Sequence, residues 1–111
     1  MYFDLFLEGL GKMISPSCPI IGKYDNEKNG YVFPLLKGGF EFSIFVEPKE
    51  NDSVLIQITY HQQTKLAYRL EDGSNEDVYN KWLSSPDYDA AIQGEMKDIL
   101  YCIYATYSLC K

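Results

Sequence analysis

The residues of this chain that could take part in catalysis are few and lie far apart in the sequence. His61 is the only histidine, and Cys18, Cys102 and Cys110 are the only cysteines. A histidine can activate a cysteine as a nucleophile when the two side chains lie within hydrogen-bond reach. Nothing in the sequence pairs His61 with a cysteine, and cysteines in apolar helices usually serve packing. We therefore predict that the protein is not an enzyme.

Metal and phosphate sites also lack their usual sequence signals. With one histidine and no pair of cysteines separated by two residues (CxxC), the chain does not gather zinc ligands. Its carboxylates do not follow the spacing of a calcium-binding loop. Gly38 and Gly39 join two predicted strands, whereas a phosphate-binding loop joins a strand to a helix. The sequence thus predicts no cofactor and no bound metal.

Residues 71–89 concentrate the charge of the chain. The segment holds six carboxylates and one lysine, so most of the net charge of −6 lies there, next to three large aromatic side chains. Tyrosine and tryptophan often anchor protein interfaces, and clustered carboxylates speed association with a basic surface. The predicted partner-binding residues are Glu71, Asp72, Glu76, Asp77, Tyr79, Trp82, Asp87, Tyr88 and Asp89.

A structural role explains part of the same segment. Ser74 can cap a short helix whose first turn contains Glu76 and Asp77, and Trp82 can pack that helix onto the core. Asp87 can stabilise the start of the following helix in the same way. At the level of sequence the binding interpretation and the structural interpretation both stay open.

A central sheet is the element that must position these residues. Three runs, 40–48, 54–61 and 65–70, alternate β-branched or aromatic residues with mostly polar ones. Such alternation indicates strands with one buried face, and the short polar breaks indicate an antiparallel meander.

A small hairpin is expected before the meander. Its first strand centres on Ile20 and Ile21, and Asn29 and Gly30 form a favoured tight-turn pair before the second strand. Pro34 lies in that second strand and cannot donate a backbone hydrogen bond. The strand should therefore lie at an edge of the sheet or contain a bulge.

Helices are predicted at both ends of the chain. Residues 2–14 place apolar side chains at three- and four-residue spacing, which indicates an amphipathic helix that covers the apolar face of the sheet. Residues 90–109 form the longest predicted helix. The apolar stripe of that helix consists of Ile92, Met96, Ile99, Ile103 and Tyr107. Its second half is apolar on nearly every side, so it needs cover from the sheet and the first helix, or from a second copy. We expect the first arrangement, and hence a monomer.

These elements predict an α+β fold in a single domain, residues 1–111. The predicted order is an N-terminal helix, a mainly antiparallel curved sheet of about five strands, and two C-terminal helices that pack on one face. A strongly curled half-barrel around the last helix is the alternative. The side chains expected to share one core are Phe42, Ile44, Ile56, Ile58, Tyr68, Met96, Ile99 and Ile103.

The charge of the chain limits which partners are expected, and its cysteines and first residues indicate the compartment. A net charge of −6 disfavours nucleic acid and anionic membrane surfaces, and it suits a basic protein partner. The three cysteines have no framework spacing, which suggests a reducing compartment. The first residues lack the basic start of a signal peptide, and no apolar run has membrane-spanning length. We expect a cytoplasmic protein.

In size, acidity and pattern the whole chain resembles the immunity proteins of bacterial toxin systems, including those of contact-dependent inhibition, although such proteins share no motif. The resemblance implies an antitoxin that neutralises a cognate toxin stoichiometrically, often a basic nuclease. Two alternatives are kept. The order of helix, meander and late helix is similar in outline to type III secretion chaperones, in which the last helix could form a dimer. A phage-encoded antagonist of a host defence protein would act by the same kind of protein binding.

Overall fold

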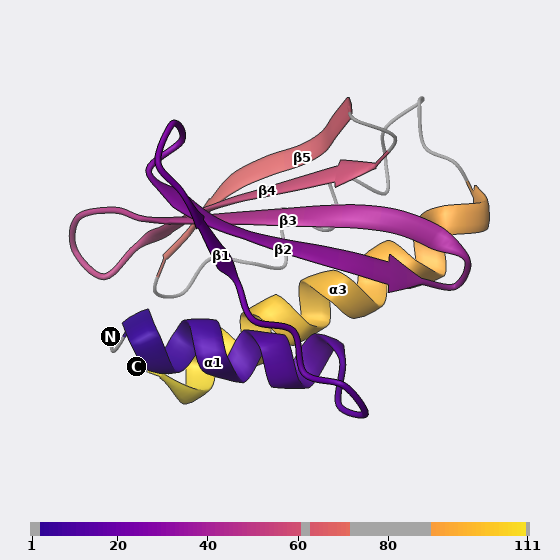
Figure 1. The fold of residues 1–111 in the computed structure, drawn as a ribbon, viewed down its shortest axis with the longest axis horizontal. Helices are drawn as coiled ribbons and strands as arrows, with labels where there is room; N and C mark the ends of the chain where they lie inside the picture. The colour runs from indigo at the N-terminus through magenta and orange to yellow at the C-terminus, as the bar shows by residue number, and fades with distance from the viewer. Residues whose placement is uncertain (1–2, 61–62, 72–89, 111) are drawn as a thin grey trace.

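A computed structural model of the chain describes residues 3–60, 63–71 and 90–110. Within these residues two helices and five strands follow one another along the chain (Figure 1). They are α1 (Phe3–Ile14), β1 (Lys23–Asp25), β2 (Gly30–Lys37), β3 (Phe40–Pro48), β4 (Val54–Tyr60), β5 (Gln63–Leu70) and α3 (Ala90–Leu109).

The five strands form one antiparallel sheet in which the spatial order is the chain order. Each strand therefore pairs with the next one through a short connection, as the meander pattern predicts. One register shift occurs in the β4–β5 pair, between Ile58 and Thr59. The predicted α+β class and the antiparallel five-stranded sheet are confirmed.

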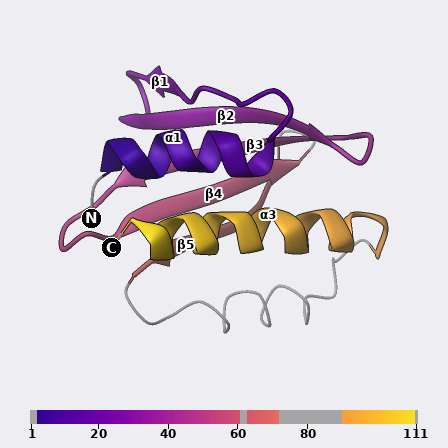
Figure 2. The ribbon, with the colours of Figure 1, turned by 90° about the horizontal axis from the view of Figure 1, so that it is seen from below.

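Both described helices lie on the same face of this sheet. Seen from below in Figure 2, α1 and α3 run side by side in front of the strands, and the N- and C-terminal ends of the chain lie close together. The side chains of the strands that face the helices, and those of the helices that face the strands, form one buried cluster. The cluster contains all the predicted core residues except Tyr68, which is partly buried and packs against it. Tyr68 lies on β5, the last strand of the described sheet, where fewer neighbours surround a side chain.

The first strand differs from its prediction. It begins at Lys23, and Ile21 is exposed instead of lying in a strand. The backbone N–H of Ile20 donates a hydrogen bond to the carbonyl oxygen of Gly11, 3.2 Å away in α1. Because the chain is tied to the helix at Ile20, it pairs with β2 only from Lys23, three residues later.

The missing backbone N–H of Pro34 removes no hydrogen bond between β1 and β2. β1 pairs with β2 only as far as Val32, so Pro34 is beyond the last described pairing on that side of β2. On the other side it pairs in register with Ser43 of β3. The strand was expected at an edge or with a bulge; it lies between β1 and β3 at its start, becomes an edge only beyond Val32, and has no register shift at Pro34.

The last helix agrees with the prediction, whereas the segment before it lies outside the described residues. Helix α3 covers the predicted residues 90–109, and its whole apolar stripe is buried. The other predicted helix and the predicted caps of α3 fall within 72–89, outside the described residues. Neither described helix combines the length and the apolar character needed to cross a membrane.

The expected enclosure of the second half of α3 is wrong on one side. Leu100, Ile103 and Tyr107 are buried, but the exposed fractions of Tyr101, Tyr104 and Leu109 are 69%, 44% and 79%. The sheet and α1 contact α3 on two of its sides only. The third side, which has apolar residues as well, faces away from both.

Candidate functional site

Most of the predicted partner-binding residues lie outside the described part of the chain. Glu71 is the exception, and its carboxylate lies 3.9 Å from Nε of Arg69 just after β5, where both side chains are about half exposed. The remaining eight, Asp72, Glu76, Asp77, Tyr79, Trp82, Asp87, Tyr88 and Asp89, fall within 72–89, and His61 is likewise outside. Their roles stay predictions.

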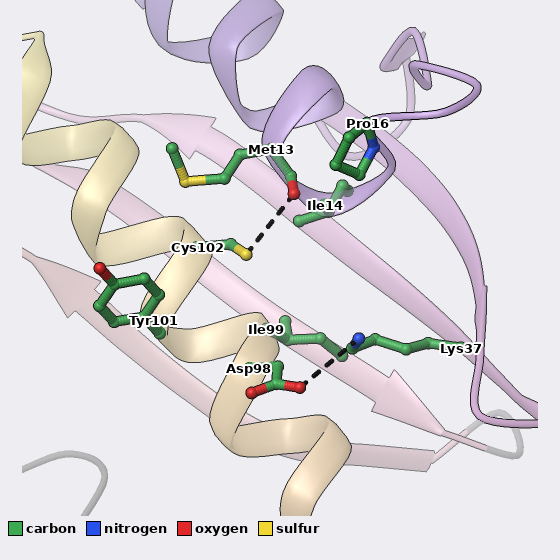
Figure 3. A pocket seen from close by; sticks show the side chains of 8 residues that line it. All are labelled: Met13, Ile14, Pro16, Lys37, Asp98, Ile99, Tyr101 and Cys102. Atoms are coloured by element: carbon green, nitrogen blue, oxygen red, sulfur yellow. Dashed lines mark hydrogen bonds and ion pairs between the residues drawn. The ribbon is translucent and has the colours of Figure 1, made fainter.

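The described residues contain a pocket between the C-terminal half of α1 and the middle of α3 (Figure 3). It has a volume of about 300 Å³. Its lining residues are Met13, Ile14, Pro16, Lys37, Asp98, Ile99, Tyr101 and Cys102. Three segments that are far apart in the sequence therefore meet here: the end of α1, the end of β2, and two turns of α3.

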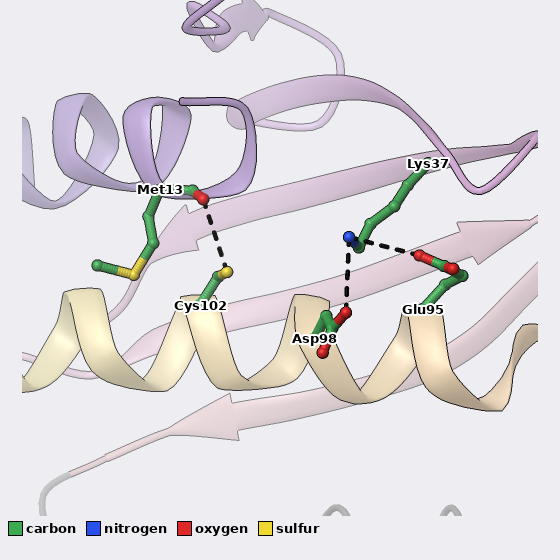
Figure 4. A network of polar contacts seen from close by, with 5 residues as sticks. All are labelled: Met13, Lys37, Glu95, Asp98 and Cys102. Carbon is green, nitrogen blue, oxygen red and sulfur yellow. Dashed lines mark hydrogen bonds and ion pairs between the residues drawn. The ribbon is translucent and has the colours of Figure 1, made fainter. Parts of the chain in front are cut away.

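The charged end of the pocket is a lysine between two carboxylates (Figure 4). Nζ of Lys37 lies 3.4 Å from Oε2 of Glu95 and 3.6 Å from Oδ2 of Asp98. Lys37 is the last residue of β2, and it faces the helices because Leu35 and Phe33 of the same strand do. Glu95 and Asp98 are three residues apart in α3, so they lie on the same side of that helix.

The thiol of Cys102 closes the apolar side of the pocket. Its Sγ donates to the backbone oxygen of Met13 over 3.7 Å, which links α3 to α1. Burial raises the pKa of the Cys102 thiol and so does the carboxylate of Asp98, while the ammonium of Lys37 lowers it in part. A nucleophilic cysteine needs the opposite environment, one that stabilises the thiolate. Cys102 is thus placed for packing, and the arrangement offers no activated nucleophile.

We expect the three cysteines to react with iodoacetamide at very different rates. Cys18 is exposed, whereas Cys102 is partly buried and its pKa is raised, so near neutral pH its reactive thiolate is scarce. Mass spectrometry of the native protein at pH 7.5 should find Cys18 alkylated first and Cys102 last. The Cys18→Ser variant is the control, and rapid alkylation of Cys102 in that folded variant would contradict the described packing of the pocket.

The side of α3 that faces away from the sheet forms an aromatic surface. Lys97, Tyr101, Tyr104 and Ser108 are all exposed and follow one another at spacings of four, three and four residues, which places them in one row. No hydrogen bond is formed by the hydroxyl of Tyr101 or Tyr104 within the described part of the chain. The row continues the mouth of the pocket, because Tyr101 belongs to both.

The exposed side of α1 adds a further apolar residue to this surface. Gly9 packs against Thr106 and Met13 against Cys102, so the two helices run antiparallel. Leu5, at the start of α1, therefore lies toward the end of α3 that contains Leu109, and both side chains are exposed. We call Leu5, Asp98, Tyr101, Tyr104 and Leu109 the helical surface. The sequence signal for it was the apolar second half of α3, whose exposed side the pattern could not identify.

In the part of the chain that the structure describes, no group of three or more histidine, cysteine, aspartate or glutamate side chains could hold a metal ion. Comparison with protein-family models, with curated proteins and with solved structures found no match to this chain. The function is therefore argued from its own residues.

Proposed function

We propose that this protein is a small cytoplasmic inhibitor that binds a basic protein partner stoichiometrically, as immunity proteins bind their toxins. The observation that supports the proposal is the helical surface, on which Tyr101 and Tyr104 are exposed one turn apart beside the carboxylate of Asp98. Exposed apolar patches with polar edges are typical of protein-interaction sites. Tyrosine is among the residues that contribute most to binding when a partner covers it.

The energetics favour a role for these rings in binding. Removing a large apolar side chain from water contributes roughly 1.5–3 kcal/mol, and two neighbouring rings can supply the centre of an interface. The hydroxyls remain able to donate to a partner, which suits an interface that is apolar with a polar tip. A partner can still cover much of both residues, whose exposed fractions are 69% for Tyr101 and 44% for Tyr104.

The charge of the chain favours a basic partner. The protein has a net charge of −6, and residues 71–89 account for most of it. At the edge of the pocket Lys37 is paired with two carboxylates, those of Glu95 and Asp98, so this ion cluster has a net negative charge. Complementary charge raises the rate of association and excludes acidic proteins as partners. A basic toxin domain, such as the nuclease that the resemblance implies, has the required chemistry.

One alternative is favoured by the same observation. In a chaperone of the type III secretion kind, Tyr101, Tyr104 and Leu109 would form the seam between two copies. A phage-encoded antagonist of a host defence protein would use the surface as an inhibitor does. Sedimentation at micromolar concentration distinguishes the chaperone, which would be a dimer, from the inhibitor and the phage-encoded antagonist, because the inhibitor is expected to be a monomer.

Replacing both tyrosines should abolish tight binding without unfolding the protein. The candidate partner is the product of the neighbouring gene, with binding measured by calorimetry and inhibition by the rescue of growth. We expect a one-to-one complex that the Tyr101→Ala/Tyr104→Ala variant forms at least about 30-fold more weakly, because one hot-spot residue contributes about 2 kcal/mol or more. Leu36→Ala is the matched control, since its side chain is 71% exposed but lies on β2, away from the helical surface.

The predicted role of the acidic segment enters the same experiment. Asp72→Lys/Asp77→Lys should slow association and reduce its dependence on salt, with little change in the dissociation rate. Wild-type affinity in the double tyrosine variant, with an unchanged circular dichroism spectrum, would remove the helical surface from the interface. Wild-type association in the charge-reversed variant would leave residues 71–89 with the structural role described above.

A further inference from the structure

The pocket between α1 and α3 has a shape and a charge that suit one class of side chain. We propose that it receives an arginine side chain of the partner, with the guanidinium at Asp98 and Tyr101 and the methylene groups along Met13 and Ile99. The inference rests on the proposed function, because the arginine belongs to a protein that binds the helical surface. It adds the chemical identity of the group that this surface recognises.

The walls of the pocket are apolar over most of their extent. Met13, Ile14 and Pro16 come from α1 and the residues that follow it, and Ile99 comes from α3 (Figure 3). A volume of about 300 Å³ is at the lower limit of sites that hold small ligands, and it is sufficient for a long side chain. Long cationic side chains bury their methylene groups on such walls and keep the charged head at the polar end.

The polar end of the pocket has acceptors that Lys37 does not fully use. Its Nζ lies 3.4 Å from Glu95 and 3.6 Å from Asp98, whereas a charge-assisted hydrogen bond between an ammonium and a carboxylate is about 2.7–2.9 Å long. Lys37 therefore neutralises one charge without a short hydrogen bond to either carboxylate. The Asp98 side chain is also 64% exposed, so an incoming donor can reach it.

The sign of the local charge selects a cation. The ion cluster of Lys37, Glu95 and Asp98 has one negative charge in excess, and Asp98 is the carboxylate of this cluster that lines the pocket, which disfavours an anionic ligand. Lys97, the next cation along α3, is exposed on the row of Tyr101 and makes no ion pair with either carboxylate among the described residues. A second cation therefore restores neutrality at this end of the pocket.

Arginine fits this site better than lysine for geometric reasons. A guanidinium is planar, donates two parallel hydrogen bonds to one carboxylate, and stacks on an aromatic ring. Asp98 offers the carboxylate and Tyr101 offers the ring, three residues apart on the same side of α3. An ammonium is more strongly hydrated and cannot make both contacts at once.

The test uses n-butylguanidinium as a probe in place of the partner. Titrated into the full-length protein and followed by NMR, it should produce saturable shifts at Met13, Ile99 and Cys102, with a dissociation constant in the millimolar range that is normal for a fragment. Neutral n-butylurea, which has nearly the same shape, and n-butylammonium should bind more weakly. Asp98→Asn and Tyr101→Leu should each weaken the probe, Asp98→Asn by about tenfold.

Glu41→Gln is the matched control, because it removes an exposed carboxylate from β3 without touching the pocket. Equal shifts with n-butylurea, tighter binding of n-butylammonium, or unchanged binding in Asp98→Asn would each overturn the assignment of an arginine site. The titration needs no partner, so its failure is distinct from failure of the proposed function. If the double tyrosine variant loses the partner while the probe does not bind, the inhibitor function stands and the arginine site falls.

Discussion

Replacing Gly11 with alanine is expected to destabilise the protein by about 3 kcal/mol or more, although the same change usually strengthens a helix. Gly11 is buried in α1, and a Cβ there would overlap the carbonyl oxygen of Ile20. A backbone atom cannot rotate away as a side chain can. The chain after α1 would have to move, and the hydrogen bond from Ile20 N–H to Gly11 would be lost with it.

Gly94→Ala is the matched control for this result. Gly94 lies in α3 and is exposed, and apart from its own helix no atom of the described residues lies within 4 Å of the position that a Cβ would occupy. This substitution should therefore stabilise the protein, by about 0.5–1 kcal/mol. Urea unfolding followed by circular dichroism would compare the two midpoints. An unchanged or raised midpoint for Gly11→Ala would show that α1 does not pack against the segment around Ile20.

The second large effect is expected at the centre of the core. Ile56→Ala should lower the free energy of unfolding by about 2–5 kcal/mol, because it leaves a cavity on the helix-facing side of β4. Ile56 is fully buried, and its neighbours in register are Val46 of β3 and Tyr68 of β5. The sheet on one side and two helices on the other prevent the site from collapsing onto the missing atoms.

Leu36→Ala removes a side chain of the same size from β2, where it is largely exposed on the other face of the sheet. A change of less than about 0.5 kcal/mol is expected for it. Differential scanning calorimetry or urea unfolding of both variants would measure the contrast. If Ile56→Ala were as mild as Leu36→Ala, the described register, which points Ile56 inward, would be wrong.

Local periodicity was sufficient to predict the three strands of the meander, the two described helices and most of the core. Alternation in β3 and β4 put Phe42, Ile44, Ile56 and Ile58 on one face, and that face is the buried one. The stripe of α3 was equally clear. The reason is that each residue's direction within a strand or helix depends on its neighbours in sequence, so a regular pattern of apolar residues reports directly on burial.

Contacts between distant segments were beyond the reach of the pattern. Ile20 and Ile21 were predicted to begin a strand because they are apolar and β-branched, yet the chain at Ile20 is bonded to α1. The close approach at Gly11 was equally hidden, since a glycine in a helix usually only weakens it. Both features depend on where the chain after α1 packs against that helix. Local conformational preferences contain no information about this contact.

The candidate site was the part that only the tertiary structure decided. Lys37, Met13 and Asp98 come from three elements and meet because α1 and α3 lie side by side over the end of β2. The sequence predicted that the second half of α3 is apolar, but the packing of α1 and the sheet determined that Tyr101 and Tyr104 remain outside. The sequence of a helix shows how much apolar surface the helix has. Which side of the helix stays exposed depends on how many other elements pack around it.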